Sequence, residues 1–182
     1  MSDHHFSLIL SGPVEAKLDD LFEAGCDDAT FGSVDGMAYA EFDREAESLV
    51  LAIGSAIHDV ESIADIRVTH VEPDALVTAS EIAERLGRSR ESVRLLISGE
   101  RGAGDFPSPI SHLRSRNRLW RWSDVAAWAQ LEDVDALESA KLIAAVNAAL
   151  ELRSSTRLLP TDARKLVASL GRRVAESPGP RG

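Results

Sequence analysis

The sequence predicts an α+β fold made of three units. Three observations lead to this prediction: strand and helix periodicities alternate over the first 70 residues, two short capped helices follow, and the last third is helical. The 182 residues are 44% hydrophobic and 27% charged, which is typical of a globular protein with room for two or three small domains. We expect units at 1–72, 77–130 and 131–176, a linker at 73–76 and a disordered tail at 177–182.

A strand and a helix are expected at the start of the chain. Phe6, Leu8 and Leu10 alternate with their neighbours, as they do in a half-buried strand. Gly12-Pro13 then opens a helix, because proline is tolerated in the first turn. Gly25 stands where a left-handed residue ends such a helix. The expected apolar stripe of the helix is Val14, Leu18, Leu21 and Phe22.

A hairpin, a second helix and a fourth strand complete the first unit. Asp35-Gly36 is a strong hairpin signal between strands at 29–34 and 37–42, and Asp43 is placed to cap the helix that follows. The buried face expected for that helix is Ala46, Leu49, Val50, Ile53, Ile57 and Val60. Ile66 and Val68, with His70, indicate the last strand. The order strand, helix, strand, strand, helix, strand is that of a ferredoxin-like domain, a fold that does not by itself indicate a function.

Charge divides the chain more sharply than hydrophobicity does. The net charge is -10, which taken whole argues against nucleic acid as a partner. Residues 1–76 hold 17 acidic residues against three lysines and arginines, whereas residues 77–122 hold nine arginines against five acidic residues. The middle unit is therefore the part that can approach a polyanion, and the acidic unit is suited to a basic protein partner.

The middle unit begins with two short helices joined by a tight turn. Thr78 and Glu81 form a capping-box pattern, Gly87 ends the first helix, and Ser89 is placed to cap a second helix at 90–98. This pattern predicts a helix-turn-helix, whose second helix reads the major groove of DNA. The expected DNA-contacting residues of this helix and its approach are Arg88, Arg90, Glu91, Ser92 and Arg94.

A basic hairpin is expected to follow. Residues 107–113 and 119–122 resemble strands, and Ser123-Asp124 is placed to cap a third helix. The strands would form a wing, whose arginines can bind phosphates or enter a narrow minor groove. The expected contact residues at its tip are Arg114, Arg116, Asn117 and Arg118.

Residues 77–130 resemble the winged helix-turn-helix of MerR-type and phage excisionase-type regulators. The residues that carry the likeness read TASEIAERLGRSRESVRLLI, then FPSPI, then RLWRWSDVAAWA. The resemblance implies that the second helix reads the major groove and that the wing holds the backbone. Leu95 departs from the pattern, because a polar residue is expected at that position.

The C-terminal unit reads as two amphipathic helices separated by Pro160-Thr161. The apolar stripes expected for them are Leu142, Ile143, Val146, Ala149 and Leu150 in the first and Leu166, Val167, Leu170 and Val174 in the second. These stripes must cover the winged helix or meet a second copy of the chain. The symmetry of many DNA-reading dimers favours a homodimer.

The sequence thus predicts a sequence-specific transcription regulator that binds double-stranded DNA and carries out no catalysis. The alternatives are an architectural recombination factor like the excisionases, and an antitoxin or protein-interaction module. We expect no catalytic residues, no metal and no cofactor, since no suitable cluster is visible. One cysteine, no secretory signal and no long apolar run predict a cytoplasmic protein without a membrane partner.

Overall fold

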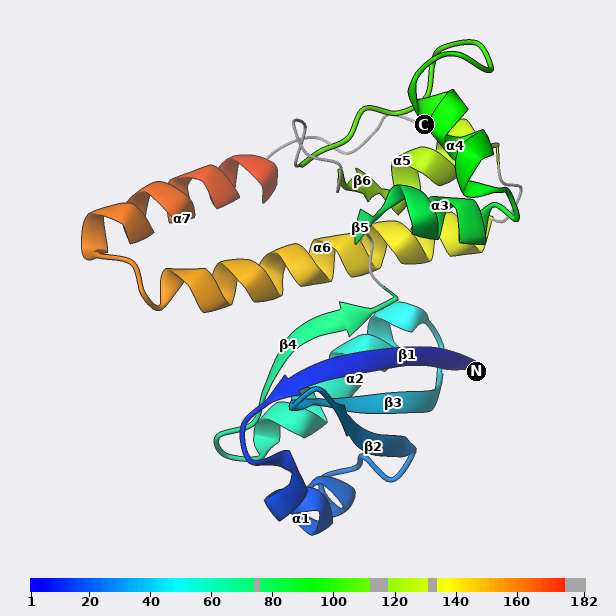
Figure 1. Cartoon of the computed structure of the whole chain (residues 1–182). Coiled ribbons are helices and arrows are strands. Elements are labelled where there is room, and N and C mark those ends of the chain that lie inside the picture. The colour runs from blue at the N-terminus through cyan, green and yellow to red at the C-terminus, as the bar shows by residue number, and fades with distance from the viewer. Residues whose placement is uncertain (74–75, 112–117, 131–133, 176–182) are drawn as a thin grey trace.

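The computed structural model describes residues 1–73, 76–111, 118–130 and 134–175. As predicted, the chain is a mixed α+β protein with an antiparallel sheet. In Figure 1 the four-stranded sheet lies at one end of the molecule, the short helices α3, α4 and α5 lie at the other, and the long helix α6 runs between them.

The four-stranded sheet has the order β2-β3-β1-β4, and every neighbouring pair is antiparallel. The strands are β1 (Ser2–Ser11), β2 (Ala29–Val34), β3 (Met37–Ala46) and β4 (Arg67–Glu72). The predicted hairpin is present, since Asp35 and Gly36 both have a positive φ in the turn between β2 and β3. β4 is shifted from the prediction, since Ile66 is buried but precedes the strand, and the strand continues past His70 through the fully buried Val71.

The first helical segment is shorter than the sequence indicates. It consists of a 3-10 turn, η1 (Val14–Lys17), followed by α1 (Leu18–Glu23), and it ends before Gly25 at φ +99°. The predicted stripe is half right, because Val14 and Leu21 are buried whereas Leu18 and Phe22 are exposed.

The second helix, α2 (Leu49–Ser62), begins later than predicted. Asp43 does not cap it, because β3 continues through Asp43 to Ala46 in register with β1. Ser48 is the actual cap and accepts a hydrogen bond from the Leu51 N–H at 3.3 Å. The predicted buried face therefore changes: Ala46 belongs to the strand and Val50 is exposed, while Ala52 and Ala56 are buried beside Ile53 and Val60.

A buried arginine lies beside the hydrophobic core of the N-terminal unit. Arg44 on β3 is 7% exposed, on the sheet face that also carries Phe42. Its guanidinium donates to Asp28 at 2.7 and 2.9 Å, to Asp59 at 2.8 Å and to Ser55 at 3.0 Å. It also donates to the Gly25 carbonyl at 2.7 Å, so the charge is fully surrounded by acceptors. The hydrogen bonds that Arg44 donates to Asp28 and Asp59 raise its pKa further above the ordinary value.

A second, two-stranded sheet opens the middle unit. β5 (Leu76–Val77) pairs with β6 (Trp120–Arg121), so Leu76 lies in a strand rather than in the predicted linker at 73–76. The helices of this unit are α3 (Ala79–Arg85), α4 (Arg90–Ile97) and α5 (Trp122–Trp128). Ser123-Asp124 is not the cap of α5, because the helix already starts at Trp122 and has no side-chain cap.

Helix α6 (Val134–Thr156) covers the β4 edge of the first sheet. Its apolar stripe includes Ile143 and Leu150, which join the buried core of the N-terminal unit, with Leu142 and Val146 packed against that core. The sequence left two partners open for this stripe, the winged helix or a second copy. The structure gives a third partner, because the stripe packs on the chain's own N-terminal sheet.

Polar side chains fasten α6 to the same edge. Asn147 acts as an extra peptide group: its Oδ1 accepts from the Val71 N–H at 2.8 Å and its Nδ2 donates to the Val71 carbonyl at 2.8 Å. Arg153 donates to the Val68 carbonyl at 2.9 Å and to both oxygens of Glu61. Side chains of α6 therefore form hydrogen bonds with backbone groups on the exposed edge of β4.

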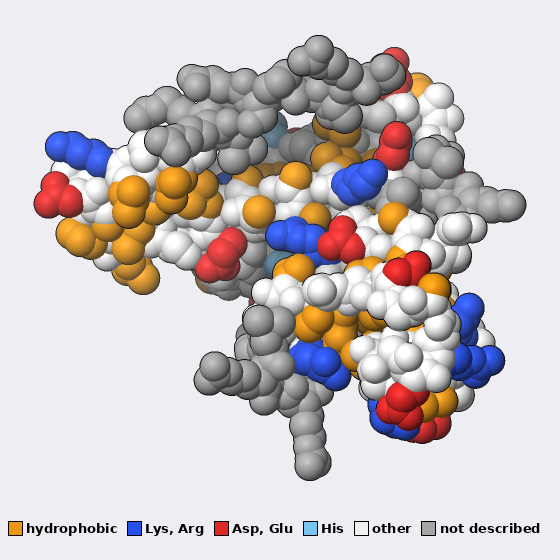
Figure 2. Space-filling model, turned by 90° about the horizontal axis from the view of Figure 1, so that it is seen from above, with side chains coloured by type: hydrophobic (Ala, Val, Ile, Leu, Met, Phe, Trp, Pro, Cys, Tyr) orange, Lys and Arg blue, Asp and Glu red, His pale blue; other side chains and the backbone are white. Residues whose placement is uncertain are grey.

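The last helix, α7 (Thr161–Ala175), packs least. Leu158 in the preceding loop is 90% exposed, and Leu166 and Leu170 on α7 are 61% and 55% exposed. In Figure 2 hydrophobic side chains gather on the surface over this end of the molecule. No helix in the described part of the chain is long and apolar enough to cross a membrane.

Candidate nucleic-acid interface

The helix pair α3–α4 is held by the caps that the sequence predicts. The Thr78 N–H donates to Glu81 at 2.7 Å, and the Glu81 N–H donates to the Thr78 hydroxyl at 3.3 Å. Hydrogen bonding of Thr78 to the Glu81 carboxylate, chiefly from the Thr78 backbone N–H, lowers the pKa of Glu81. Ser89 accepts from the Ser92 N–H at 3.1 Å, and Gly87 turns the chain at φ +61° between the helices.

One small core fixes the angle between these helices and α5. The fully buried residues of this core come from β5, α3, α4, β6 and α5, and they are Val77, Ile82, Val93, Trp120 and Val125. Because all five elements share this core, α4 is held with one face inward and the other in solvent.

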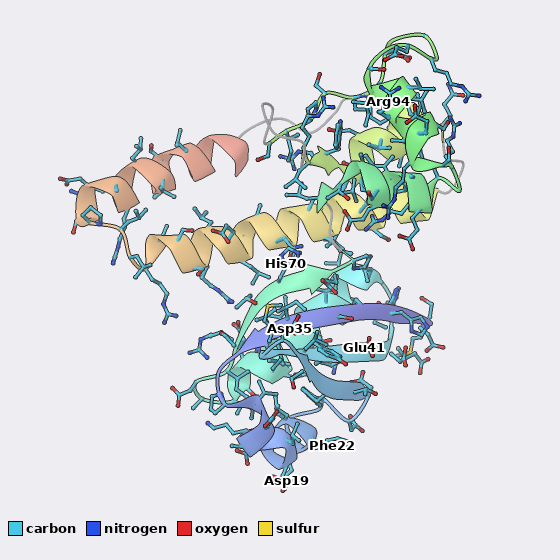
Figure 3. All side chains as sticks on the ribbon, in the orientation of Figure 1. Asp19, Phe22, Asp35, Glu41, His70 and Arg94 are labelled. Carbon is cyan, nitrogen blue, oxygen red and sulfur yellow. The ribbon has the colours of Figure 1, made fainter. Side chains whose placement is uncertain are left out.

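The outward face of α4 carries most of the residues that the sequence predicts for DNA contact. Arg88, Arg90, Glu91 and Arg94 are all exposed. Ser92 is half-buried, so it lies at the edge of this face rather than in its middle. Figure 3 shows Arg94 on α4, at the opposite end of the molecule from Asp19 and Phe22 in the N-terminal unit. Leu95, the departure from the family pattern, is half-buried.

Arg94 is already engaged by two carboxylates. Its Nε donates to both oxygens of Glu91 at 3.1 and 3.0 Å, and its Nη2 donates to Glu91 at 2.9 Å. Its Nη1 lies 3.5 Å from Glu100. The hydrogen bonds lower the pKa of Glu91 and raise that of Arg94. Both side chains are more than half exposed, so water and salt screen the pair and it can exchange for another partner.

The sequence analysis assigned no position to three other arginines of the middle unit. Arg101, just after α4, donates to the Ser92 hydroxyl at 3.5 Å. Arg85 of α3 lies over the ring of Trp122, with its guanidinium carbon 5.1 Å from the ring centre. Arg121 is exposed on β6. The signal was the count of nine arginines in residues 77–122, of which only some were assigned a position.

The expected wing is present only in part within the described residues. Within the described residues 107–111 and 119–122 the named strand is β6, and it pairs with β5 rather than with the 107–111 segment. The two segments meet through one bridge: the Ile110 N–H donates to the Leu119 carbonyl at 2.8 Å, and the Leu119 N–H donates to the Ser111 carbonyl at 3.3 Å. Arg114, Arg116 and Asn117 lie outside the described residues.

Arg118, the remaining predicted wing residue, is half-buried at the base of this segment. Its guanidinium carbon lies 5.5 Å from the centre of the Trp120 ring. Trp120 is 1% exposed, and its Nε1 donates to the Pro107 carbonyl at 3.0 Å. This tryptophan therefore anchors the segment to the core and is not available to stack on a base.

The described residues contain no group of three or more histidine, cysteine, aspartate or glutamate side chains that could hold a metal ion. The site is thus a surface of arginines and short polar side chains on a rigid helix pair. Such a surface can donate hydrogen bonds to phosphates and base edges. Comparison with family models, curated proteins and solved structures gave no match to the chain.

Proposed function

We propose that the chain is a sequence-specific, double-stranded DNA-binding transcription regulator. In this proposal α4 enters the major groove, with Arg90 and Arg94 at base edges, and the segment around Arg118 lies on the backbone or in the minor groove. The observation that carries the proposal is the exposed face of α4, which presents arginines from a helix capped and packed on its other side.

The same proposal assigns folds to the two units. The N-terminal unit is ferredoxin-like, and its chain order β1-α1-β2-β3-α2-β4 with sheet order β2-β3-β1-β4 supports this assignment. Residues 77–130 are a winged helix-turn-helix. The capped pair α3–α4, the β5–β6 ribbon and the bridge between Ser111 and Leu119 support it.

The Glu91–Arg94 pair gives the proposal a specific mechanism. Within the described part of the chain, Arg94 is balanced by Glu91 and Glu100, so the unbalanced positive charge of α4 and the residues just before it comes from Arg88 and Arg90. These two arginines attract any duplex, whereas Arg94 must leave Glu91 to pair with a guanine. Exchange occurs only where the base contact is better than the ion pair, which favours sequence selectivity over general affinity.

A homodimer belongs to the proposal. The exposed Leu166 and Leu170 of α7 form an apolar surface on a helix whose inner neighbour, α6, is committed to the N-terminal core. Sedimentation equilibrium should give a dimer mass for the wild type and a monomer mass for Leu166→Asp. A monomer mass for both proteins at micromolar concentration would remove dimerisation from the proposal.

Mobility-shift assays with the full-length protein on genomic fragments test the main proposal. At low and moderate salt, the wild type should form a complex with some fragments in preference to others. Arg90→Ala and Arg94→Ala should weaken that complex, while Lys141→Ala, which removes an exposed cation from α6, should leave it unchanged. The absence of any fragment preference at both salt concentrations would contradict the proposal.

A further inference from the structure

A cationic cavity lies where the start of β4 meets the C-terminal half of α6. Its volume is about 320 Å³, and three of its lining side chains are Arg67, Arg153 and Arg157. No acidic side chain is among the described residues that line it. This is unexpected beside residues 1–76, which hold 17 acidic residues and three lysines and arginines, of which Arg67 is one. In Figure 1 this half of α6 points away from α5 and the helix pair.

The three arginines differ in how far their charge is balanced. Arg153 donates to both oxygens of Glu61, at 2.8 and 2.6 Å, and Glu61 is only 19% exposed. Arg153 is therefore largely neutralised and serves to fasten α6. Within the described part of the chain, neither Arg67 nor Arg157 has a carboxylate partner at ion-pair distance. These two side chains give the cavity its excess of positive charge.

The rest of the lining suits a ligand that is only partly polar. Ser154 adds a hydroxyl group from α6. Val68 and Leu150 provide an apolar wall, and both belong to the buried core at 2% and 7% exposure. A cavity of this size lies at the lower end of the range for small-molecule sites. This volume suits one compact molecule with an anionic group.

We propose that this cavity binds a small phosphorylated molecule, with its phosphate group between Arg67 and Arg157. Phosphate fits this pair because each planar guanidinium can offer two parallel N–H donors to phosphate oxygens. The non-phosphate part of the molecule lies against Val68 and Leu150. Two ligands could supply this phosphate group, a phosphorylated organic molecule or the free phosphate ion. The experiment below distinguishes them.

Binding at this cavity joins β4 to α6, because Arg67 belongs to the strand and Arg157 follows the helix. α6 also packs on α5 through its first half, so the ligand stabilises the arrangement of the acidic unit relative to the middle unit. The binding site itself does not depend on whether the chain binds DNA.

Titration calorimetry of the full-length protein with AMP and with inorganic phosphate tests the proposal. AMP should bind the wild type, and Arg67→Gln and Arg157→Gln should each weaken it about tenfold or more, as expected for loss of a charge-assisted hydrogen bond. The matched control, Lys141→Gln, removes an exposed cation from the same helix outside the cavity and should bind AMP as the wild type does. Weaker binding of inorganic phosphate indicates an organic ligand, whereas equal binding assigns the cavity to the free ion.

Two results would overturn the proposal. The first is no binding of either probe up to about 10 mM, a concentration at which even weak sites are occupied. The second is binding that Arg67→Gln and Arg157→Gln leave unchanged in variants whose circular dichroism matches the wild type. A short duplex is measured in parallel: if both variants weaken duplex binding but not AMP binding, the arginines are DNA contacts and the cavity is not a phosphate site.

Discussion

Replacement of Arg44 by methionine should destabilise the protein more than replacement of any other arginine except Arg153, which fastens α6 to β4. Methionine keeps most of the apolar stem of the side chain but leaves Asp28 and Asp59 without their shared cation. Loss of one member of a buried ion pair costs about 3–5 kcal/mol. Asp28 and Asp59 keep 28% and 23% side-chain exposure, so water relieves part of this cost. We therefore expect a loss of about 3 kcal/mol in the free energy of unfolding.

Urea denaturation followed by far-ultraviolet circular dichroism measures this loss from the shift in midpoint. Arg88→Met is the matched control, because Arg88 is exposed and its loss should cost less than about 0.5 kcal/mol. Adding Asp28→Asn and Asp59→Asn to Arg44→Met removes the stranded charges and should restore part of the stability. A loss below about 1 kcal/mol for Arg44→Met would refute the reasoning, and so would a triple variant less stable than the single one.

Further predictions concern the candidate interface, the caps and the cysteine. Arg94→Ala should relax the choice of base at one position by about 1–3 kcal/mol, measured by competition between DNA sequences. Arg118→Ala should weaken all sequences alike and flatten the log–log salt dependence by about 0.9 if it touches phosphate, whereas an unchanged slope would place it off the backbone. The lowered pKa of Glu81 means that its stabilising effect is complete above its ordinary value of 4.5 and is lost as the pH falls through the lower, folded-state pKa. Glu81→Gln should therefore be less stable than the wild type at pH 7, and the gap should close as the pH falls below the lowered, folded-state pKa of Glu81. Burial raises the pKa of Cys26 to about 11, so at pH 8 iodoacetamide should modify it only when urea unfolds the chain, and rapid modification of the folded protein would contradict this burial.

Local signals in the sequence predicted the helix pair well. Thr78 with Glu81, and Ser89, are caps whose partners lie within three residues, so the pattern contains the whole interaction. The turn at Asp35-Gly36 is predictable for the same reason.

Features that depend on distant partners were not predictable. Asp43 has the composition of a helix cap, yet β1 holds it in a strand by pairing it with His5. Trp120 pairs with Val77 on β5, and the stripe of α6 packs on β4, because an apolar pattern indicates that a face is buried but not what buries it.

Arg44 shows the same limit for charge. It stands in the acidic run from Asp43 to Glu47, which composition alone assigns to a solvated face. Two positions after Phe42 on the same strand face, it points inward. Period-two alternation could therefore have indicated that Arg44 is buried. It could not have indicated the carboxylate partners of Arg44, because these come from other elements.

Selection of bound sequences from a random duplex library by the full-length protein tests most directly the claim that α4 reads base sequence. We expect one enriched motif for the wild type, with a base preference that disappears at one position in Arg94→Ala. A palindromic motif would also indicate a symmetric dimer. A library left unenriched by the wild type, or a motif identical in the wild type and in the Arg90→Ala, Arg94→Ala double variant, would contradict the claim.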